Sequence, residues 1–187
     1  NFPEGEKRTF VWYYWLSEES YNKRVGQMPI LREWRAAGLI KVCEGNYIDQ
    51  DTLEADIVSI CRYFRLIKAG VDPFYCWDLV GKLQNVHNLP TETYRQNFQM
   101  FSEPIRKTEE LISGCKINHG FNPVSRWMLG NVSIKSSAGG GRMISKENKS
   151  SAVDGIVAMV MSEGVFASTP QPKQSYLAAQ GASLIKF

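Results

Sequence analysis

An almost uninterrupted apolar segment near the carboxyl end constrains the fold of this chain more than any other feature. Residues 156–161 read Ile-Val-Ala-Met-Val-Met, and a helix that is apolar on nearly every face has to be buried on nearly every face. The segment before it is polar and basic, and one carboxylate, Asp154, stands where the two meet. The pattern therefore predicts a buried helix with Asp154 at the edge of the core, beside a cationic loop.

Length and composition are typical of a globular chain. The 187 residues suit one domain with a sizeable core. No apolar run approaches the roughly 20 residues of a membrane span, and the first residues lack the apolar segment of a signal peptide. The four cysteines are widely spaced without a C-x-x-C pair, which argues against zinc and against a disulfide framework and indicates a reducing compartment. A net charge of +3 is too small to indicate nucleic-acid binding by itself.

Strand-like and helix-like segments alternate along most of the chain. This order predicts an α/β fold, a sheet with parallel neighbours covered by helices. We place one domain at residues 1–163 and a flexible tail, rich in Ser, Pro and Gln, at residues 164–187. The predicted strands are residues 9–15, 39–43, 66–71, 91–95, 116–119 and 132–135, and the predicted helices start near residues 17, 30, 51, 73, 102, 123 and 152.

Two aspartates stand at predicted helix starts. Asp72 follows a strand, and sites in parallel sheets form at the carboxyl ends of strands; equally, it can cap a helix whose first residue is Pro73. Asp154 can complete a capping box with Ser151 and favour the helix dipole. Taken together, the two carboxylates could instead converge on divalent metal ions that bind phosphate and activate water.

The predicted loop or loose hairpin at residues 136–151 combines glycines with three spaced cations, Arg142, Lys146 and Lys149. Such a loop suits salt-sensitive, sequence-independent contact with DNA phosphates. A solvated loop without a ligand explains the same residues equally well. The phosphate-binding pattern G-x-x-x-x-G-K-[ST] is absent from the sequence, so the chain carries no ATP-hydrolysing motor of that type.

The remaining chemistry-bearing residues suggest no further site. His87 and His119 belong to no zinc-binding motif, and there is no G-x-S-x-G nucleophile elbow. We expect the five tryptophans to pack in the interior rather than to present base-stacking surfaces; they are Trp12, Trp15, Trp34, Trp77 and Trp127.

Four segments, taken in order and with their spacing, resemble one family. They are Gly70–Phe74, similar to a Y-D-P-W strand end; Phe101–Pro104, similar to an S-E-P helix start; His119–Trp127, similar to H-G-x-N-P-V-x-R-W; and Lys149–Ala158, similar to K-x-x-x-x-D-G-I-V-A. That family is the large terminase subunits of tailed bacteriophages. No single segment is decisive, but the ordered set, spanning about residues 9–163, is specific.

The resemblance implies the carboxy-terminal nuclease domain of a terminase, with an RNase H-like mixed sheet flanked by helices. Such a domain cuts concatemeric double-stranded DNA with little sequence preference, using two Mg²⁺ or Mn²⁺ ions, in the host cell cytoplasm. Asp72 and Asp154 fall on two of the family's acids. The family's first acid lies on a central strand upstream of the turn that Asn1–Gly5 resembles. We therefore expect that strand and a third acidic ligand to precede this chain, and residues 1–187 alone to cleave poorly.

The resemblance also implies partners: double-stranded DNA, the amino-terminal ATPase domain of the same subunit, the small terminase subunit and the portal. Two alternatives stay open. One is a catalytically silent DNA-binding or docking module of the packaging machine, and the other is a different RNase H-like nuclease such as a junction resolvase.

Overall fold

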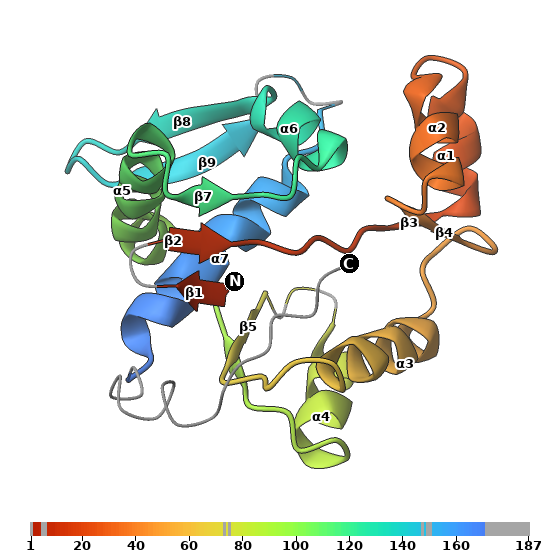
Figure 1. Ribbon diagram of the computed structural model, residues 1–187, viewed down its shortest axis with the longest axis horizontal. Helices are drawn as coiled ribbons and strands as arrows, with labels where there is room; N and C mark the ends of the chain where they lie inside the picture. Colours follow the sequence, from red (N-terminus) through yellow and green to blue (C-terminus); the bar gives the residue numbers. More distant parts are fainter. Residues whose placement is uncertain are drawn as a thin grey trace.

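The computed structural model describes residues 2–4 (backbone only), 7–72, 74, 76–146, 148 and 151–170 (Figure 1). The helices are α1 (Glu18–Val25), α2 (Ile30–Ala36), α3 (Gln50–Cys61), α4 (Trp77–Asn85), α5 (Phe98–Ser113), α6 (Pro123–Leu129) and α7 (Asp154–Ser168). The strands are β1 (Phe2–Glu4), β2 (Lys7–Thr9), β3 (Trp15–Ser17), β4 (Lys41–Cys43), β5 (Ala69–Val71), β6 (Thr91–Thr93), β7 (Ile117–Asn118), β8 (Val132–Ser136) and β9 (Arg142–Lys146). Within the described residues, no helix is long and apolar enough to cross a membrane.

The strands form four small ladders of mixed direction. β1 pairs antiparallel with β2, which pairs parallel with β7. β3 with β4, and β5 with β6, are parallel pairs whose members are separated in sequence by helices. β8 and β9 form an antiparallel hairpin, so the segment predicted as a loop or loose hairpin at residues 136–151 supplies the turn and the second strand, and the strand predicted at residues 132–135 supplies the first. The mixed α/β class is therefore confirmed, with the strands grouped in short ladders.

Helix α7 passes through the middle of the molecule and contacts α5, α6 and β5 (Figure 1). Its first half joins one apolar cluster through Ile156 and Met159, and its second half joins another through Val160, Met161 and Val165. All five side chains are buried. The predicted buried helix is confirmed, and it connects the two halves of the core.

The carboxyl end of α7 lies beyond the predicted one. The helix runs to Ser168 rather than ending at Glu163, because Glu163 is buried beside Arg8 of β2, with a nitrogen–oxygen distance of 3.3 Å. The Arg8 guanidinium also lies 4.1 Å above the centre of the Phe166 ring. Glu163, which the sequence suggested as the polar end of the helix, is therefore a buried acidic residue within it. Most of the predicted tail, residues 171–187, lies outside the described part of the chain.

Two tyrosines press against α7 where the helix has no side chain. A Cβ on Gly164 would lie 1.8 Å from the Tyr94 hydroxyl, and one on Gly155 would lie 2.6 Å from the Tyr14 hydroxyl. Directly after Gly164, Val165 packs against Gly70 of β5, where a Cβ would lie 2.5 Å from Val165 Cγ2. Only glycine permits approaches this close, so these contacts set the position of α7.

The Tyr94 contact depends on a proline inside α5. Pro104 has no N–H, so the carbonyl of Met100 lacks its helical donor; the Tyr94 hydroxyl donates to that carbonyl at 2.8 Å instead. The prediction that Ser102-Glu103-Pro104 opens the helix is wrong, because α5 begins at Phe98, and Asn97 caps it by accepting from the Met100 amide. Pro104 is thus compensated by a tyrosine from outside the helix.

Other local predictions had mixed outcomes. Residues 9–15 do not form one strand: the segment leaves β2 at Thr9 and enters β3 at Trp15, in a different ladder. The helix predicted to start near residue 51 begins at Gln50, and Asp49 caps it by accepting from the Thr52 amide at 2.9 Å. The predicted helix starts near residues 17 and 123 are confirmed: α1 follows Ser17, and α6 begins at Pro123 with Asn122 as its cap.

Replacing Gly164 by Ala tests the tyrosine contact. The added methyl group would overlap Tyr94, so the variant should lose roughly 3 kcal/mol of unfolding free energy, measured by urea denaturation. Gly81→Ala in α4 is the matched control, since no atom lies within 4 Å of a Cβ there. It should keep or gain about 0.5–1 kcal/mol. Equal stability of the two variants would contradict the packing described for α7.

The bonds of the Asp56 carboxylate with Lys41 and Trp15 should make the free energy of unfolding depend on pH. Its carboxylate accepts from Lys41 Nζ at 2.6 Å and from Trp15 Nε1 at 2.7 Å; these bonds, that of Lys41 first, hold the pKa of Asp56 below its usual range. The stabilisation of the folded state by these bonds is therefore present near neutral pH and is lost as pH falls through the lowered pKa of Asp56. Asp56→Ala should cost about 1 kcal/mol at pH 7 and clearly less at pH 3, measured by denaturant titration. The exposed carboxylate Asp78 supplies the control, and a deficit for Asp56→Ala that stays constant with pH would refute this account.

Candidate functional site

Asp72 lies where the parallel strands β5 and β6 end. The register pairs Val71 with Thr93, and the Tyr94 amide donates to the Val71 carbonyl at 2.8 Å. The residues that follow the two strands are therefore neighbours. Gln96 Nε2 donates to Asp72 Oδ2 at 2.5 Å. This edge, at the carboxyl ends of parallel strands, is the usual place for a site in an open α/β sheet.

Asp72 does not cap a helix. α4 begins at Trp77, with Cys76 at its N-cap position, so the predicted N-cap role of Asp72 is wrong; Pro73 lies outside the described residues. Instead, Asp72 Oδ1 accepts from the Phe74 amide at 3.2 Å, and Cys76 Sγ donates to the Asp72 carbonyl at 2.9 Å. These bonds fix the half-buried Asp72 relative to Phe74 and Cys76.

Asp154 is the exposed first residue of α7. Val153 occupies the N-cap position, and no side chain accepts a bond from the first turn, so the predicted capping box with Ser151 is wrong. A carboxylate in the first turn still interacts favourably with the helix dipole. The backbone behind it is held by Asn131 Nδ2, which donates to the Ala152 carbonyl at 3.1 Å.

Two side chains support the helix directly behind Asp154. The Gly155 amide donates to Met128 Sδ at 3.3 Å, and Tyr14 lies against the Gly155 Cα. Burial raises the pKa of Tyr14, so its phenol stays neutral and adds no charge beside Asp154. The Tyr14 hydroxyl is buried without a hydrogen-bond partner among the described residues. Asp154 therefore extends outward from a rigid, largely apolar base.

The two aspartates do not touch each other. Gly70 packs against Val165, which lies about three turns, or roughly 16 Å, along α7 from Asp154. Asp72 follows Gly70 by roughly 7 Å of extended backbone. Carboxylate oxygens suit Mg²⁺ or Mn²⁺, but the described residues contain no group of three or more His, Cys, Asp or Glu placed to hold a metal ion.

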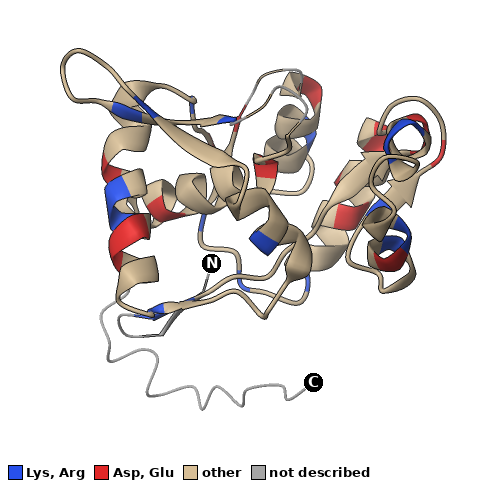
Figure 2. Cartoon of the chain, turned by 90° about the horizontal axis from the view of Figure 1, so that it is seen from above, with Lys and Arg blue, Asp and Glu red and all other residues tan. Residues whose placement is uncertain are grey.

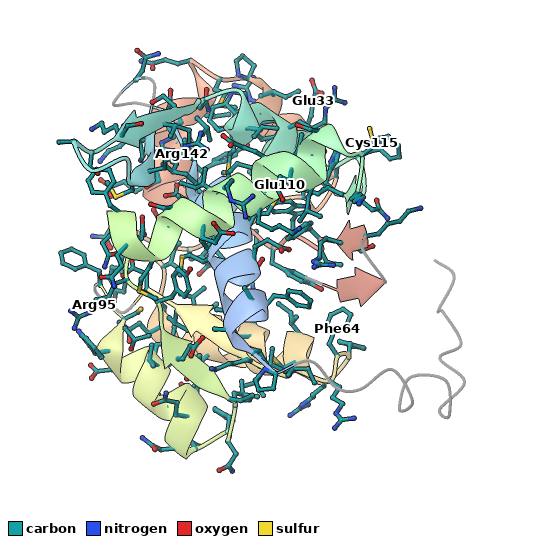
Figure 3. The ribbon with its side chains drawn as sticks, turned by 90° about the vertical axis from the view of Figure 1, so that its left-hand side faces the viewer. Glu33, Phe64, Arg95, Glu110, Cys115 and Arg142 are labelled. Carbon is teal, nitrogen blue, oxygen red and sulfur yellow. The ribbon has the colours of Figure 1, made fainter. Side chains whose placement is uncertain are left out.

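The predicted DNA-contacting cations lie on and beside the β8–β9 hairpin. Arg142 is engaged in an ion pair at the surface: its guanidinium donates to both carboxylate oxygens of Glu109 on α5, at 2.6 and 2.7 Å, which raises the pKa of Arg142. Lys146 is exposed at the end of β9. Lys149 lies outside the described residues. Figure 3 shows Arg142 above α5, and Figure 2 shows acidic and basic residues interleaved along that helix.

The structure also shows residues near Asp72 that the sequence analysis did not identify as candidates for the site. Arg95 and Gln96 follow β6 and reach the edge where Asp72 lies. Trp77, expected to pack in the interior, is 63% exposed, which makes that expectation wrong for this residue. The other four tryptophans are buried or half-buried, as expected. Only the pairing of β5 with β6 could have revealed this grouping, and short parallel strands leave a weak sequence signal.

Comparisons with known proteins agree with the geometry. A family model described as "Terminase large subunit, endonuclease domain" matches residues 7–169. The large terminase subunit of Enterobacteria phage HK97 is 25% identical over 171 residues, 86% of this chain and 33% of that protein. Protein YmfN of Escherichia coli K12 is 25% identical over 149 residues, 79% of this chain and 32% of that protein. The chain thus spans about a third of the length of these relatives.

The crystal structure of the HK97 large terminase shares the fold. It superposes with a TM-score of 0.73 at 24% sequence identity, covering 81% of this chain and 32% of that chain. The expected RNase H-like fold is thereby confirmed. Since the family model covers most of the sequence and the fold agrees, the chain belongs to the terminase large subunit family, as its endonuclease domain.

Proposed function

We propose that this domain hydrolyses phosphodiester bonds of concatemeric double-stranded DNA during phage packaging, with little sequence preference and with Mg²⁺ or Mn²⁺. The observation that carries the proposal is the family match over residues 7–169. It is supported by the placement of Asp72 at the carboxyl ends of two parallel strands and of Asp154 at the start of the central helix. Hydrolysis of a phosphodiester needs charge neutralisation and an activated water, and acidic residues recruit ions for both tasks.

Asp72 and Asp154 would hold the metal ions through their carboxylate oxygens. Bound Mg²⁺ or Mn²⁺ would polarise the phosphate and lower the pKa of a coordinated water. The chain's own contribution is orientation: Gln96 fixes one oxygen of Asp72, and Gly155 with Met128 fixes the turn that carries Asp154. Because two carboxylates are a sparse set for two ions, a further acidic ligand from outside the described residues is needed.

The wider assignment follows the family. The partners we propose are an ATPase domain of the same subunit, the small terminase subunit and the portal, with the host cytoplasm as the compartment. The domain predicted at residues 1–163 includes the rest of α7 as far as Ser168, and we propose that the residues after this helix form a tail. The relative from phage HK97 is described as the large terminase subunit, which supports this setting.

A catalytically silent DNA-binding or docking module is the second candidate. It is favoured by the absence of a group of three metal-binding side chains from the described residues. Mn²⁺ titration separates the two: a nuclease should bind the ion through Asp72 and Asp154, whereas a docking module need not. If the domain is a nuclease, comparing linear duplex with four-way junctions as substrates distinguishes a packaging nuclease from a resolvase.

Asp154→Ala should abolish Mn²⁺-dependent nicking of supercoiled plasmid by the full-length protein, because the variant loses a metal ligand while α7 keeps its packing. We expect a loss of at least about 100-fold, in the range of removing a key electrostatic group. Asp78→Ala is the matched control, since Asp78 is also an acid in the first turn of a helix. It should cut normally, and undiminished cleavage by Asp154→Ala would remove the basis of the assignment.

Lys146→Ala should weaken duplex binding regardless of sequence and lower the slope of log K against log salt by about one. Arg142→Ala should have a smaller effect, because Glu109 already neutralises its guanidinium. Fluorescence anisotropy with a labelled duplex at several salt concentrations measures both. Lys23→Ala on α1 is the control, and a salt slope that is the same for Lys146→Ala and Lys23→Ala would exclude a phosphate contact by Lys146.

A further inference from the structure

The edge formed by the ends of β5 and β6 carries three kinds of group that suit a nucleic-acid strand. After β5 come the carboxylate of Asp72 and the aromatic rings of Phe74 and Trp77; after β6 comes the guanidinium of Arg95. The pairing of Val71 with Thr93 makes the two segments neighbours, and the contact from Gln96 to Asp72 joins them. We call Asp72, Phe74, Trp77 and Arg95 the β5–β6 edge.

Both aromatic side chains of the edge are largely exposed. Phe74 is 72% and Trp77 63% exposed. The Asp72 carboxylate accepts from the Phe74 amide, and the Asp72 carbonyl accepts from Cys76 Sγ. Two large aromatic side chains exposed this close together in sequence form an apolar surface of the kind that contact sites use.

Arg95 differs from Arg106 and Arg142, two arginines that are engaged in ion pairs. Arg106 pairs with Glu103, and Arg142 pairs with Glu109. For Arg95, no acidic partner lies within ion-pair distance in the described part of the chain. Figure 3 shows Arg95 directed away from the body of the molecule. A planar guanidinium in this setting can form two parallel hydrogen bonds with a phosphate.

We propose that the β5–β6 edge binds the DNA strand that is to be cut, with Arg95 on a phosphate and with Phe74 and Trp77 stacked on an adjacent base. The inference rests on the proposed function, because it places the scissile strand at Asp72. A protein partner with an apolar surface fits less well, since it would desolvate Asp72 and Arg95. A nucleotide supplies a phosphate for the guanidinium and a π-face for the rings.

Stacking on a protein ring requires a base that has left the duplex stack. The edge therefore selects a strand that is locally opened at the cut, such as a frayed end or a bubble. This deepens the proposed function by naming the state of the substrate: double-stranded DNA with unpaired bases beside the scissile phosphate.

The test uses the full-length protein without divalent metal, so that binding is measured apart from cleavage. Arg95→Ala and the double variant Phe74→Ala/Trp77→Ala are compared with Arg32→Ala and Tyr47→Ala. These controls also alter exposed residues, and Tyr47 is 69% exposed. The probes are a labelled single strand, a perfect duplex and a duplex with a central bubble, and 2-aminopurine in the bubble reports stacking.

The double aromatic variant should bind the single strand and the bubble between about 5-fold and 100-fold more weakly than wild type and should lose the 2-aminopurine response. Arg95→Ala should lower the salt slope by about one. Binding within twofold of wild type, or equal losses in the control variants, would overturn the inference. If wild type cuts DNA with Mn²⁺ while these variants bind normally, only the inference fails. If the variants lose binding but wild type never cuts, the nuclease assignment fails and the edge remains a DNA-binding surface.

Discussion

The contact between Tyr94 and the backbone of α7 at Gly164 is the interaction on which most of the structure depends. It joins three elements at one point: Tyr94 follows β6, its hydroxyl satisfies the α5 carbonyl that Pro104 leaves without a donor, and its ring lies on α7. A residue larger than glycine at position 164 would separate all three. Because β5 pairs with β6, the same contact sets where Asp72 lies relative to the central helix.

The amino end of α7 repeats this arrangement. Gly155 admits Tyr14, and its amide is satisfied by the sulfur of Met128 rather than by a capping side chain. The usual cap would place a side-chain oxygen over the first turn. In α7 the first turn is held instead by contacts of Gly155 with Tyr14 and Met128 on its buried side, so no side chain of the described residues covers its other side and Asp154 faces solvent. The burial of α7 and the exposure of the Asp154 carboxylate therefore both result from this packing of the first turn.

Periodicity and composition predicted the elements well where a single physical effect dominates. The apolar residues of α7 can only be buried, and Asn122-Pro123 is a strong helix start. Predictions failed where a distant partner decided the outcome. Pro104 lies inside α5 because Tyr94 compensates for it, and Glu163 lies inside α7 because Arg8 accompanies it in the interior. Asp72 and Asp154 were predicted as candidate site residues from the sequence. That Gln96 and Trp77 lie near Asp72 becomes evident only from the structure, in which β5 pairs with β6.

The distribution of cations shows where DNA affinity can come from. An ion pair within the protein reduces what its arginine can gain from a phosphate, because binding then has to break an existing charge-assisted bond. Arg142 bears that cost through Glu109, whereas Arg95 has no such partner in the described residues. Non-specific electrostatic attraction along the β8–β9 hairpin would allow a duplex to bind in many alternative positions. A guanidinium and two rings beside Asp72 hold one strand at one position, and a strand held there is presented to the carboxylate that the proposed chemistry requires.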